Sequence, residues 1–265
     1  MNIGTRMKTF YEEASKTKLM KRTPVAIRID GRAFHTFTKG FNKPFDQTFM
    51  SAMQATMKYL CENMQGCVLG YTQSDEITFI LIDYQKLNSS AWFDYEVQKL
   101  CSISASMTTM TFNRYFREIA TTKYERDKNF WAHDDKWLAY SEKLYHTYHT
   151  IFDKAMFDAR CFNIPKDEVT NLIYWRQLDA TRNSIESVAH YYFKQSELQH
   201  KSCNDIQNML LTQKDINWND YSIPEKRGSC CIKDENGKWF LDLEIPIFKG
   251  AGRDYIERLI YFDKK

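Results

Sequence analysis

Three carboxylates stand where apolar runs of the chain end or turn. Asp30 closes the run Val-Ala-Ile-Arg-Ile, and Asp75 and Glu76 lie between the apolar runs 67–72 and 77–82. Carboxylate oxygens on rigid strands are ligands that magnesium prefers, and two such ions can hold a phosphoryl group during in-line attack. The pattern therefore indicates two-metal phosphoryl transfer. A plainer interpretation stays open, because Asp-Gly pairs and Ser-Asp-Glu runs also form ordinary turns and caps.

A basic loop follows the first of these carboxylates, and its cations suit the oxygens of a triphosphate. They are Arg32, His35, Lys39 and Lys43. The glycine at the start of the loop, Gly31, lets a backbone carbonyl or N–H come close to an ion or a phosphate. The sequence contains no Walker A loop and no GxSxG, HExxH or GxGxxG motif that would indicate another chemistry.

The elements around these residues alternate between strand and helix. Apolar, β-rich runs predict strands, and apolar residues at three- and four-residue spacing predict helices, one of which begins at Asp46 as its N-cap. The predicted strands are 24–29, 67–72, 77–82 and 157–164, and the helices are 47–64 and 92–119. The order strand, helix, strand, strand, helix, strand is that of a ferredoxin-like fold. We therefore predict an α+β fold whose antiparallel sheet has helices on one face and brings the carboxylates together at one end.

The remaining segments add helices and a hairpin. An aromatic, charged stretch at 121–156 contains three histidines, which favour a surface helix over a metal site. A helix at 166–194, a shorter one at 202–211 and a hairpin at 229–248 are predicted after it. We expect a single catalytic unit over residues 1–265. It would consist of a palm-like core (1–120 plus 157–165), a helical insertion (121–156), and helical and hairpin additions (166–265).

The composition is that of a globular protein. Of its 265 residues, 43% are hydrophobic and 27% are charged, with a net charge of +3. Seven cysteines without a CxxC pair favour reduced thiols in a cytosolic protein. No apolar run approaches the ~20 residues of a membrane helix, and residues 1–22 lack the apolar core of a secretory signal. We expect no membrane association and a cytoplasmic location, with an organelle as the alternative.

Six short motifs, in order along the chain, resemble those of the tRNA-histidine guanylyltransferase family. They are Asp30-Gly31-Arg32-Ala33-Phe34-His35, Lys43-Pro44-Phe45-Asp46, Gln73-Ser74-Asp75-Glu76, Phe157-Asp158-Ala159-Arg160, Trp175-Arg176-Gln177 and Lys226-Arg227-Gly228. The resemblance covers roughly residues 3–233. It implies a polymerase-palm-like catalytic domain, two Mg²⁺ ions, ATP and GTP as substrates, and nucleotide addition to the 5′ end of tRNA in the 3′–5′ direction. It also implies a homotetramer.

The resemblance implies a role for individual residues. The metal ligands would be Asp30, Asp75 and the Gly31 carbonyl, and Glu76 would either act directly in catalysis or support the site from the hairpin. The nucleotide-binding residues would be Asp30, Gly31, Arg32, Ala33, Phe34, His35, Lys43, Asp46, Ser74 and Asp75. Phe34 could instead belong to the core, and Asp46 could serve only as a helix cap. Contacts to tRNA phosphates are expected from Arg160, Arg176, Arg182, Lys201 and Arg227, each of which could also be a surface or salt-bridge cation.

The chain departs from the histidine-specific branch of the family. That branch carries His-Ile-Asn-Asn after its Trp-Arg-Gln motif, where this chain has Thr181-Arg182-Asn183-Ser184, and it has Asn where this chain has Phe45. Thr-Arg-Asn-Ser is similar to the guanylyltransferase-like proteins of bacteria, archaea and some protists, which are associated with template-dependent repair of tRNAs lacking 5′ nucleotides. The resemblance therefore favours repair. The alternatives are addition of a single guanosine to histidine tRNA, a non-catalytic tRNA-binding module, and a palm-related nucleotide cyclase.

Overall fold

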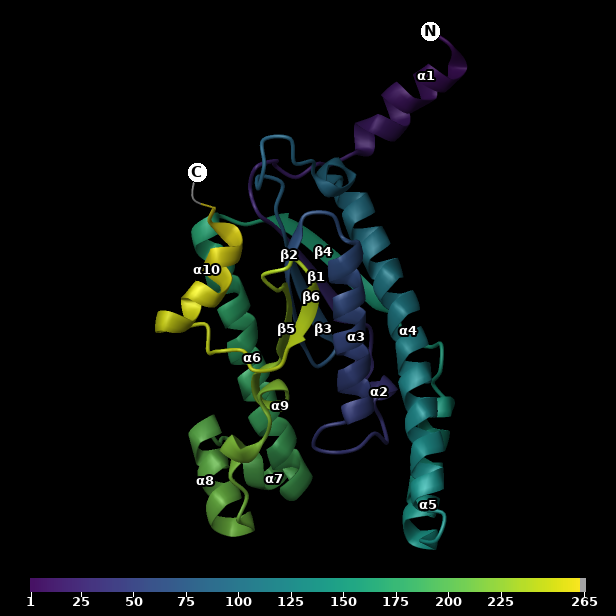
Figure 1. Cartoon of the computed structure of the whole chain (residues 1–265), viewed down its shortest axis with the longest axis vertical. Helices are drawn as coiled ribbons and strands as arrows, with labels where there is room; N and C mark the ends of the chain where they lie inside the picture. The colour runs from purple at the N-terminus through teal and green to yellow at the C-terminus, as the bar shows by residue number, and fades with distance from the viewer. Residues whose placement is uncertain (263–265) are drawn as a thin grey trace.

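An antiparallel sheet lies at the centre of the protein (Figure 1). The computed structural model describes residues 1–262, and within them the sheet has six strands in the order β4-β1-β3-β2-β5-β6. These are β1 (Val25–Gly31), β2 (Cys67–Gln73), β3 (Glu76–Leu81), β4 (Phe157–Asn163), β5 (Ser229–Lys233) and β6 (Trp239–Asp242). The first four follow the ferredoxin-like order, with β1 between β4 and β3. The predicted α+β, ferredoxin-like fold is confirmed.

Two helices cover one face of the sheet. The helices α3 (Gln47–Asn63) and α4 (Val97–Phe130) lie side by side on it (Figure 1). On α3 the buried residues Phe49, Met53 and Met57 recur at the predicted spacing. They pack against Val25, Ile27 and Ile29 of β1 in the larger hydrophobic core. Because side chains alternate along a strand, these three residues of β1 share one face.

A second layer of helices covers the opposite face. The helices α6 (Lys166–Tyr192) and α10 (Asp254–Ile260) lie there, on the left of the sheet in Figure 1. Val169 and Ile173 of α6 pack with Ala26 of β1 and Ile256 of α10 in a separate hydrophobic cluster. The helices of the ferredoxin-like core thus occupy one face, and α6 and α10, which belong to the predicted additions, occupy the other.

The helix α4 is longer than its sequence pattern indicates. It continues to Phe130, past the predicted end at residue 119 and past the proposed boundary between core and insertion at residue 120. The following helix α5 (Asp135–His149) packs back against it through a stacked pair, Tyr124 and Tyr145, whose ring centroids are 4.3 Å apart. Aromatic contacts between the helices supply the burial that this polar sequence lacks in isolation. The division of the chain into core, insertion and additions stays a prediction.

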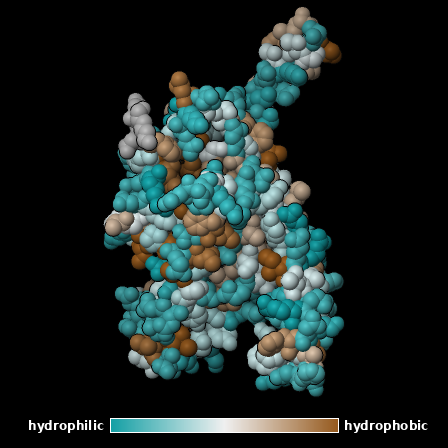
Figure 2. Space-filling model, in the orientation of Figure 1, coloured by the Kyte–Doolittle hydropathy of each residue, from teal (hydrophilic) through white to brown (hydrophobic). Residues whose placement is uncertain are grey.

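Short elements complete the fold. The N-terminal segment contains α1 (Ile3–Met7), η1 (Lys8–Glu12) and η2 (Glu13–Ser15), and Figure 2 shows it projecting from the body. The others are α2 (Phe34–Phe37), η3 (Trp92–Tyr95), α7 (Gln195–Leu198), α8 (Cys203–Lys214), η4 (Trp218–Asp220), α9 (Ile223–Arg227) and η5 (Gly250–Arg253). The helix predicted at 202–211 corresponds to α8, and the predicted C-terminal hairpin is β5–β6. Among residues 1–262, no helix has the length and apolarity needed to cross a membrane.

Asp46 connects three parts of the structure. Its Oδ1 accepts the N–H of Phe49 at 2.9 Å and so caps α3. Its Oδ2 accepts the N–H of Asn42 at 3.0 Å and the hydroxyl of Tyr148, on α5, at 2.6 Å. Asp46 is 6% exposed. One buried side chain therefore holds the loop before α3, the first turn of α3 and the end of α5 together.

Replacing Asp46 by alanine should lower the free energy of unfolding by about 2–4 kcal/mol. The loss of an N-cap costs about 1 kcal/mol, and a buried hydroxyl left without a partner costs a further ~1–3 kcal/mol. Urea unfolding followed by circular dichroism measures the change. Tyr148→Phe removes one of the three bonds and should cost about 1 kcal/mol. The double variant should lose less than the sum of the single losses, and strictly additive losses would contradict the shared bond.

Candidate active site

The end of β1 and the turn between β2 and β3 bring two of the predicted metal ligands together. The N–H of Gly31 donates to the carbonyl oxygen of Asp75 at 3.1 Å, so the residue after Asp30 is tied to the turn that carries Asp75. Burial raises the pKa of Asp75, and the nearby charges of Asp30 and Glu76 raise it further, against a hydrogen bond from the Ser74 hydroxyl. Two carboxylates that repel one another in a partly buried place favour a cation between them.

The donors at this place fit magnesium bound together with a substrate. Asp30, Asp75 and the Gly31 carbonyl provide hard oxygen atoms. Magnesium in proteins is usually held by one or two carboxylates and completes its shell with water and substrate phosphates. Among residues 1–262, no group of three or more His, Cys, Asp or Glu side chains is arranged as a metal cage. A metal here would therefore need oxygen atoms from the substrate, as in phosphoryl-transfer sites.

Glu76 is held by two arginines. Arg176, on α6, donates from Nε to Oε1 at 2.6 Å and from Nη2 to Oε2 at 2.9 Å. Arg28, on β1, donates from Nη2 to Oε2 at 2.7 Å. The side chains of Glu76 and Arg176 are only 14% and 10% exposed, so these ion pairs are little screened by water. In this geometry Glu76 joins β1, β3 and α6 directly beside Asp75, and its part in catalysis stays a prediction.

The ion pairs continue outward along α6. Arg176 also donates to Asp179 at 2.9 Å, and Arg182 donates to the other carboxylate oxygen of Asp179 at 2.5 Å. Arg176 therefore already has two carboxylate partners, Glu76 and Asp179. Its contact with RNA stays a prediction. The side chain of Arg182 is 58% exposed at the outer end of this chain of charges.

One carboxylate near the site was not among the predicted functional residues. Asp158, on β4, lies directly opposite Asp30 in the antiparallel register. Directly opposite residues project from the same face of a sheet, and Glu76 is opposite Asp30 on the other side. The three carboxylates therefore form a row across the end of the sheet. The Phe-Asp-Ala-Arg motif was the signal that contained Asp158, but its partner strand cannot be identified from the motif.

The basic loop divides into exposed and buried residues. Arg32, Ala33 and His35 are exposed, and Ala33 adopts a left-handed conformation with φ of 55°. Phe34 is 4% exposed and belongs to the larger hydrophobic core. A Cβ at Gly31 would lie 2.3 Å from the Phe34 ring, which explains why glycine is required there. The nucleotide-binding roles of these five residues stay predictions.

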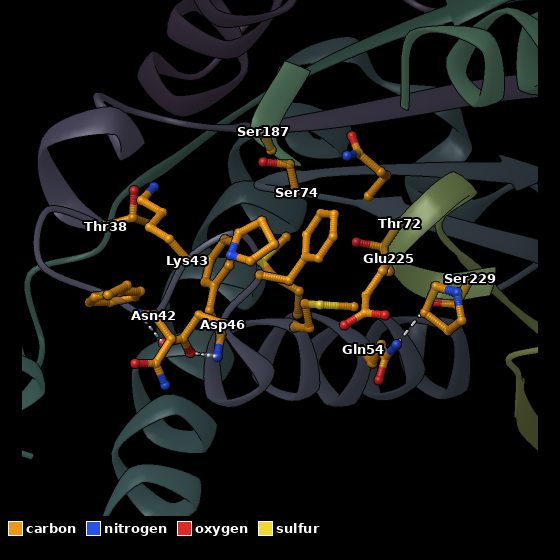
Figure 3. Close-up of a pocket in the computed structure, with 18 residues that line it drawn as sticks. Thr38, Asn42, Lys43, Asp46, Gln54, Thr72, Ser74, Ser187, Glu225 and Ser229 are labelled. Carbon is orange, nitrogen blue, oxygen red and sulfur yellow. Dashed lines mark hydrogen bonds between the residues drawn. The ribbon is translucent and has the colours of Figure 1, made fainter. Parts of the chain in front are cut away.

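A cavity of about 150 Å³ opens beside the turn between β2 and β3 (Figure 3). Three predicted nucleotide-binding residues line it: Lys43, Asp46 and Ser74. Figure 3 shows Lys43, from the loop before α3, on one side and Ser229, from β5, on the other. Lys43 is exposed, whereas the oxygens of Asp46 already accept the three hydrogen bonds described above. The cavity adjoins Asp75 because Ser74 precedes it in the chain and donates to its carboxylate at 3.0 Å.

The other predicted RNA contacts are spread over the surface. The side chain of Arg160 is 60% exposed and lies 3.5 Å from Asp158. Lys201 is exposed, and Arg227 is partly buried at the end of α9. The structure gathers Arg160 near the carboxylate row but leaves Lys201 in the short segment before α8. Their contacts with RNA stay predictions.

The chain is similar to proteins that are named tRNA(His) guanylyltransferases or are described as like them. A family model described as tRNAHis guanylyltransferase (Thg1) matches residues 4–165. A bacterial tRNA(His) guanylyltransferase (Thg1)-like protein solved in complex with ATP is 42% identical, with a TM-score of 0.81 over 98% of this chain and 100% of that one. A structure of the same description in complex with GTP is 38% identical, with a TM-score of 0.76 over 98% and 99%. The tRNA(His) guanylyltransferase of Kluyveromyces lactis is 25% identical, over 80% of this chain and 83% of that protein.

These findings agree with the family that the sequence motifs indicated. The family model spans more than half of the chain, and the similar bacterial structures cover nearly all of it. Asp30 and Asp75 both lie within the matched residues, where the end of β1 meets the turn before β3. The chain therefore belongs to the tRNAHis guanylyltransferase family and is a tRNA guanylyltransferase-like nucleotidyltransferase.

Proposed function

We propose that this protein adds nucleotides in the 3′–5′ direction to the 5′ end of tRNA and repairs 5′-truncated tRNAs by template-dependent addition. ATP or GTP would activate the 5′ monophosphate, and the 3′-hydroxyl of the incoming nucleotide would then attack the activated phosphate. The observation that carries the proposal is the convergence of Asp30 and Asp75 beside a cavity lined by Lys43 and Ser74. The likeness to bacterial proteins bound to ATP and GTP supports it.

Different residues of this chain have different roles in the proposed reaction. Asp30, Asp75 and the Gly31 carbonyl would hold two Mg²⁺ ions, which when bound neutralise charge on the reacting phosphoryl group. Arg32, His35 and Lys43 would bind and orient the triphosphate. Glu76 keeps the turn that carries Asp75 against β1 and α6 through its two arginines.

The stretch that replaces His-Ile-Asn-Asn supports repair over histidine-specific addition. Three of its four side chains have partners within the chain. Thr181 donates to the carbonyl oxygen of Gln177 at 2.9 Å, and Arg182 is paired with Asp179. Ser184 is 1% exposed and accepts the indole N–H of Trp218 at 3.0 Å. Few groups remain here to read base edges, and Watson–Crick pairing with the template strand would supply the selection.

The alternatives differ in what they require. Single guanosine addition to histidine tRNA is the alternative within the family, and the Kluyveromyces lactis relative is named a tRNA(His) guanylyltransferase. A non-catalytic tRNA-binding module gives no physical reason for placing Asp30 and Asp75 where their charges repel. Binding to tRNA and nucleoside triphosphates follows from the family. The homotetramer remains a proposal drawn from the resemblance, and the cytoplasmic location stays a prediction.

The wild-type protein should extend several 5′-truncated tRNAs whatever their anticodon, and each added base should pair with the opposing nucleotide of the acceptor stem. The measurement is single-turnover extension of 5′-labelled truncated tRNAs with each nucleoside triphosphate and magnesium, with products sized on gels. Full-length tRNA of the same sequence is the control. A strong preference for the histidine anticodon, or guanosine added opposite every base, would establish the histidine-specific alternative.

Asp30→Asn and Asp75→Asn should each lower the rates of activation and addition by about a thousandfold or more. The amide keeps the size of the side chain but removes the charge that balances the metals, and metal electrostatics supply much of the catalysis. Asp153→Asn is the matched control, because Asp153 is an exposed carboxylate paired with Arg117 at 2.8 Å. Rates are measured over a magnesium titration. Near-normal rates in either site variant at ordinary magnesium would refute the metal assignment.

Lys43→Ala should slow the activation of a 5′-monophosphorylated RNA more than addition to a 5′-triphosphorylated RNA. The triphosphorylated substrate bypasses the step in which Lys43 would hold the triphosphate of ATP or GTP. Lys86→Ala provides the control, since Lys86 is exposed in the loop after β3 and does not line the cavity. Equal losses with both substrates would mean that Lys43 does not act chiefly in activation.

A further inference from the structure

A tryptophan beside the carboxylates has about half of its surface exposed. Trp175, on α6, is 52% exposed. Two guanidinium groups lie against its ring: the Cζ of Arg176 is 4.5 Å from the ring centroid, and the Cζ of Arg28 is 5.7 Å away. An exposed indole is costly in water, and guanidinium groups that pack on it fix the orientation of the ring.

The indole lies on the same face of the sheet as the carboxylates. Arg28 and Asp30 are two residues apart on β1, so their side chains project from one face. Arg28 and Arg176, which contact the Trp175 ring, both bind Glu76. One layer of guanidinium groups therefore separates the indole from the carboxylate that adjoins Asp75.

Arginines, each paired with a carboxylate, and a further aromatic ring surround the indole. Arg160 is directly opposite Arg28 in the register of β1 and β4, so it projects from the same face, and its side chain is 60% exposed. Phe162, two residues further along β4, is 36% exposed on that face. The Nε of Arg28 is buried and has no hydrogen-bond partner in the described structure. Exposed aromatic rings among arginines are how proteins bind unpaired or terminal RNA bases.

We propose that the indole of Trp175 stacks on the terminal base at the 5′ end of the RNA substrate. The proposal rests on the proposed function, because it takes the 5′ end of an RNA as the substrate. Stacking holds the terminal base while Arg28 and Arg160 face the adjoining phosphates, and this directs the 5′ phosphate toward Asp30 and Asp75. Every base has a π face, so such a contact positions the RNA end without selecting its sequence.

The test uses the full-length protein and an RNA hairpin with a 5′ monophosphate and 2-aminopurine as its 5′-terminal base. Stacking on an indole quenches 2-aminopurine fluorescence, so the wild-type protein should quench it on binding. Trp175→Ala should remove the quenching and raise the dissociation constant for the hairpin by about tenfold or more. Trp175→Phe should keep most of the affinity, because a phenyl ring also stacks.

Tyr191→Ala is the matched control. Tyr191 lies on the same helix and is 55% exposed, but it is sixteen residues, or about 24 Å of helix, from Trp175. This variant should quench and bind as the wild type does. The affinity for ATP alone, the thermal unfolding midpoint and the molar mass by light scattering should be unchanged in Trp175→Ala. If that variant quenches and binds like the wild type, or if it changes the molar mass, the indole has another partner and the proposal fails.

Extension assays separate this proposal from the proposed function. A wild-type protein that quenches the hairpin but extends no truncated tRNA would refute the function and leave the stacking contact standing. A wild-type protein that extends truncated tRNAs, with Trp175→Ala equal to it in the Michaelis constant for RNA, would refute the stacking contact and leave the function standing.

Discussion

The ion pairs around Glu76 hold the active-site end of the protein together. Its carboxylate accepts from Arg28 of β1 and Arg176 of α6, and the side chain is only 14% exposed. Removing one partner of such a buried pair typically costs about 3–5 kcal/mol, because the remaining charge is left without compensation. The ion pairs therefore fix the position of α6 on the sheet. These contacts also position Asp75, which precedes Glu76 in the chain. They position the Trp175 ring as well, because it packs against both arginines.

The opposite side of the site is built from packing. Phe34 fills the space beneath Gly31, so the strand end that carries Asp30 lies directly on the hydrophobic core. Asp46 then fixes the loop that presents Lys43 to the cavity. Hydrophobic cores are close-packed and deform little, so packing against Phe34 holds the backbone around Asp30 rigid on the core side. On the opposite side, the ion pair between Arg28 of β1 and Glu76 holds it. A rigid frame suits phosphoryl transfer, in which the protein contributes chiefly positioning and electrostatics.

Local patterns in the sequence are sufficient for most of the core elements and for their order. Apolar strand runs, the hairpin around Asp75 and the spacing of Phe49, Met53 and Met57 predicted four strands and a helix that the structure contains. A ferredoxin-like order then requires β1 to lie beside β3, so the approach of Asp30 to Asp75 was predictable before any side chain was placed. The motifs also identified the family, because six of them occur in one order.

The partners of individual side chains depended on the tertiary structure. Glu76 and Arg176 are a hundred residues apart in sequence, and no local pattern indicates that they meet. Asp158 faces Asp30 because β4 pairs with β1 in a register that the order of the strands alone does not fix. The burial of the Phe34 side chain and the full length of α4 also depended on tertiary packing, since both depend on what packs against them. Sequence determined which residues and elements are present through local backbone and side-chain preferences, whereas long-range packing alone decided which charges are paired, which rings are buried and which indole remains exposed.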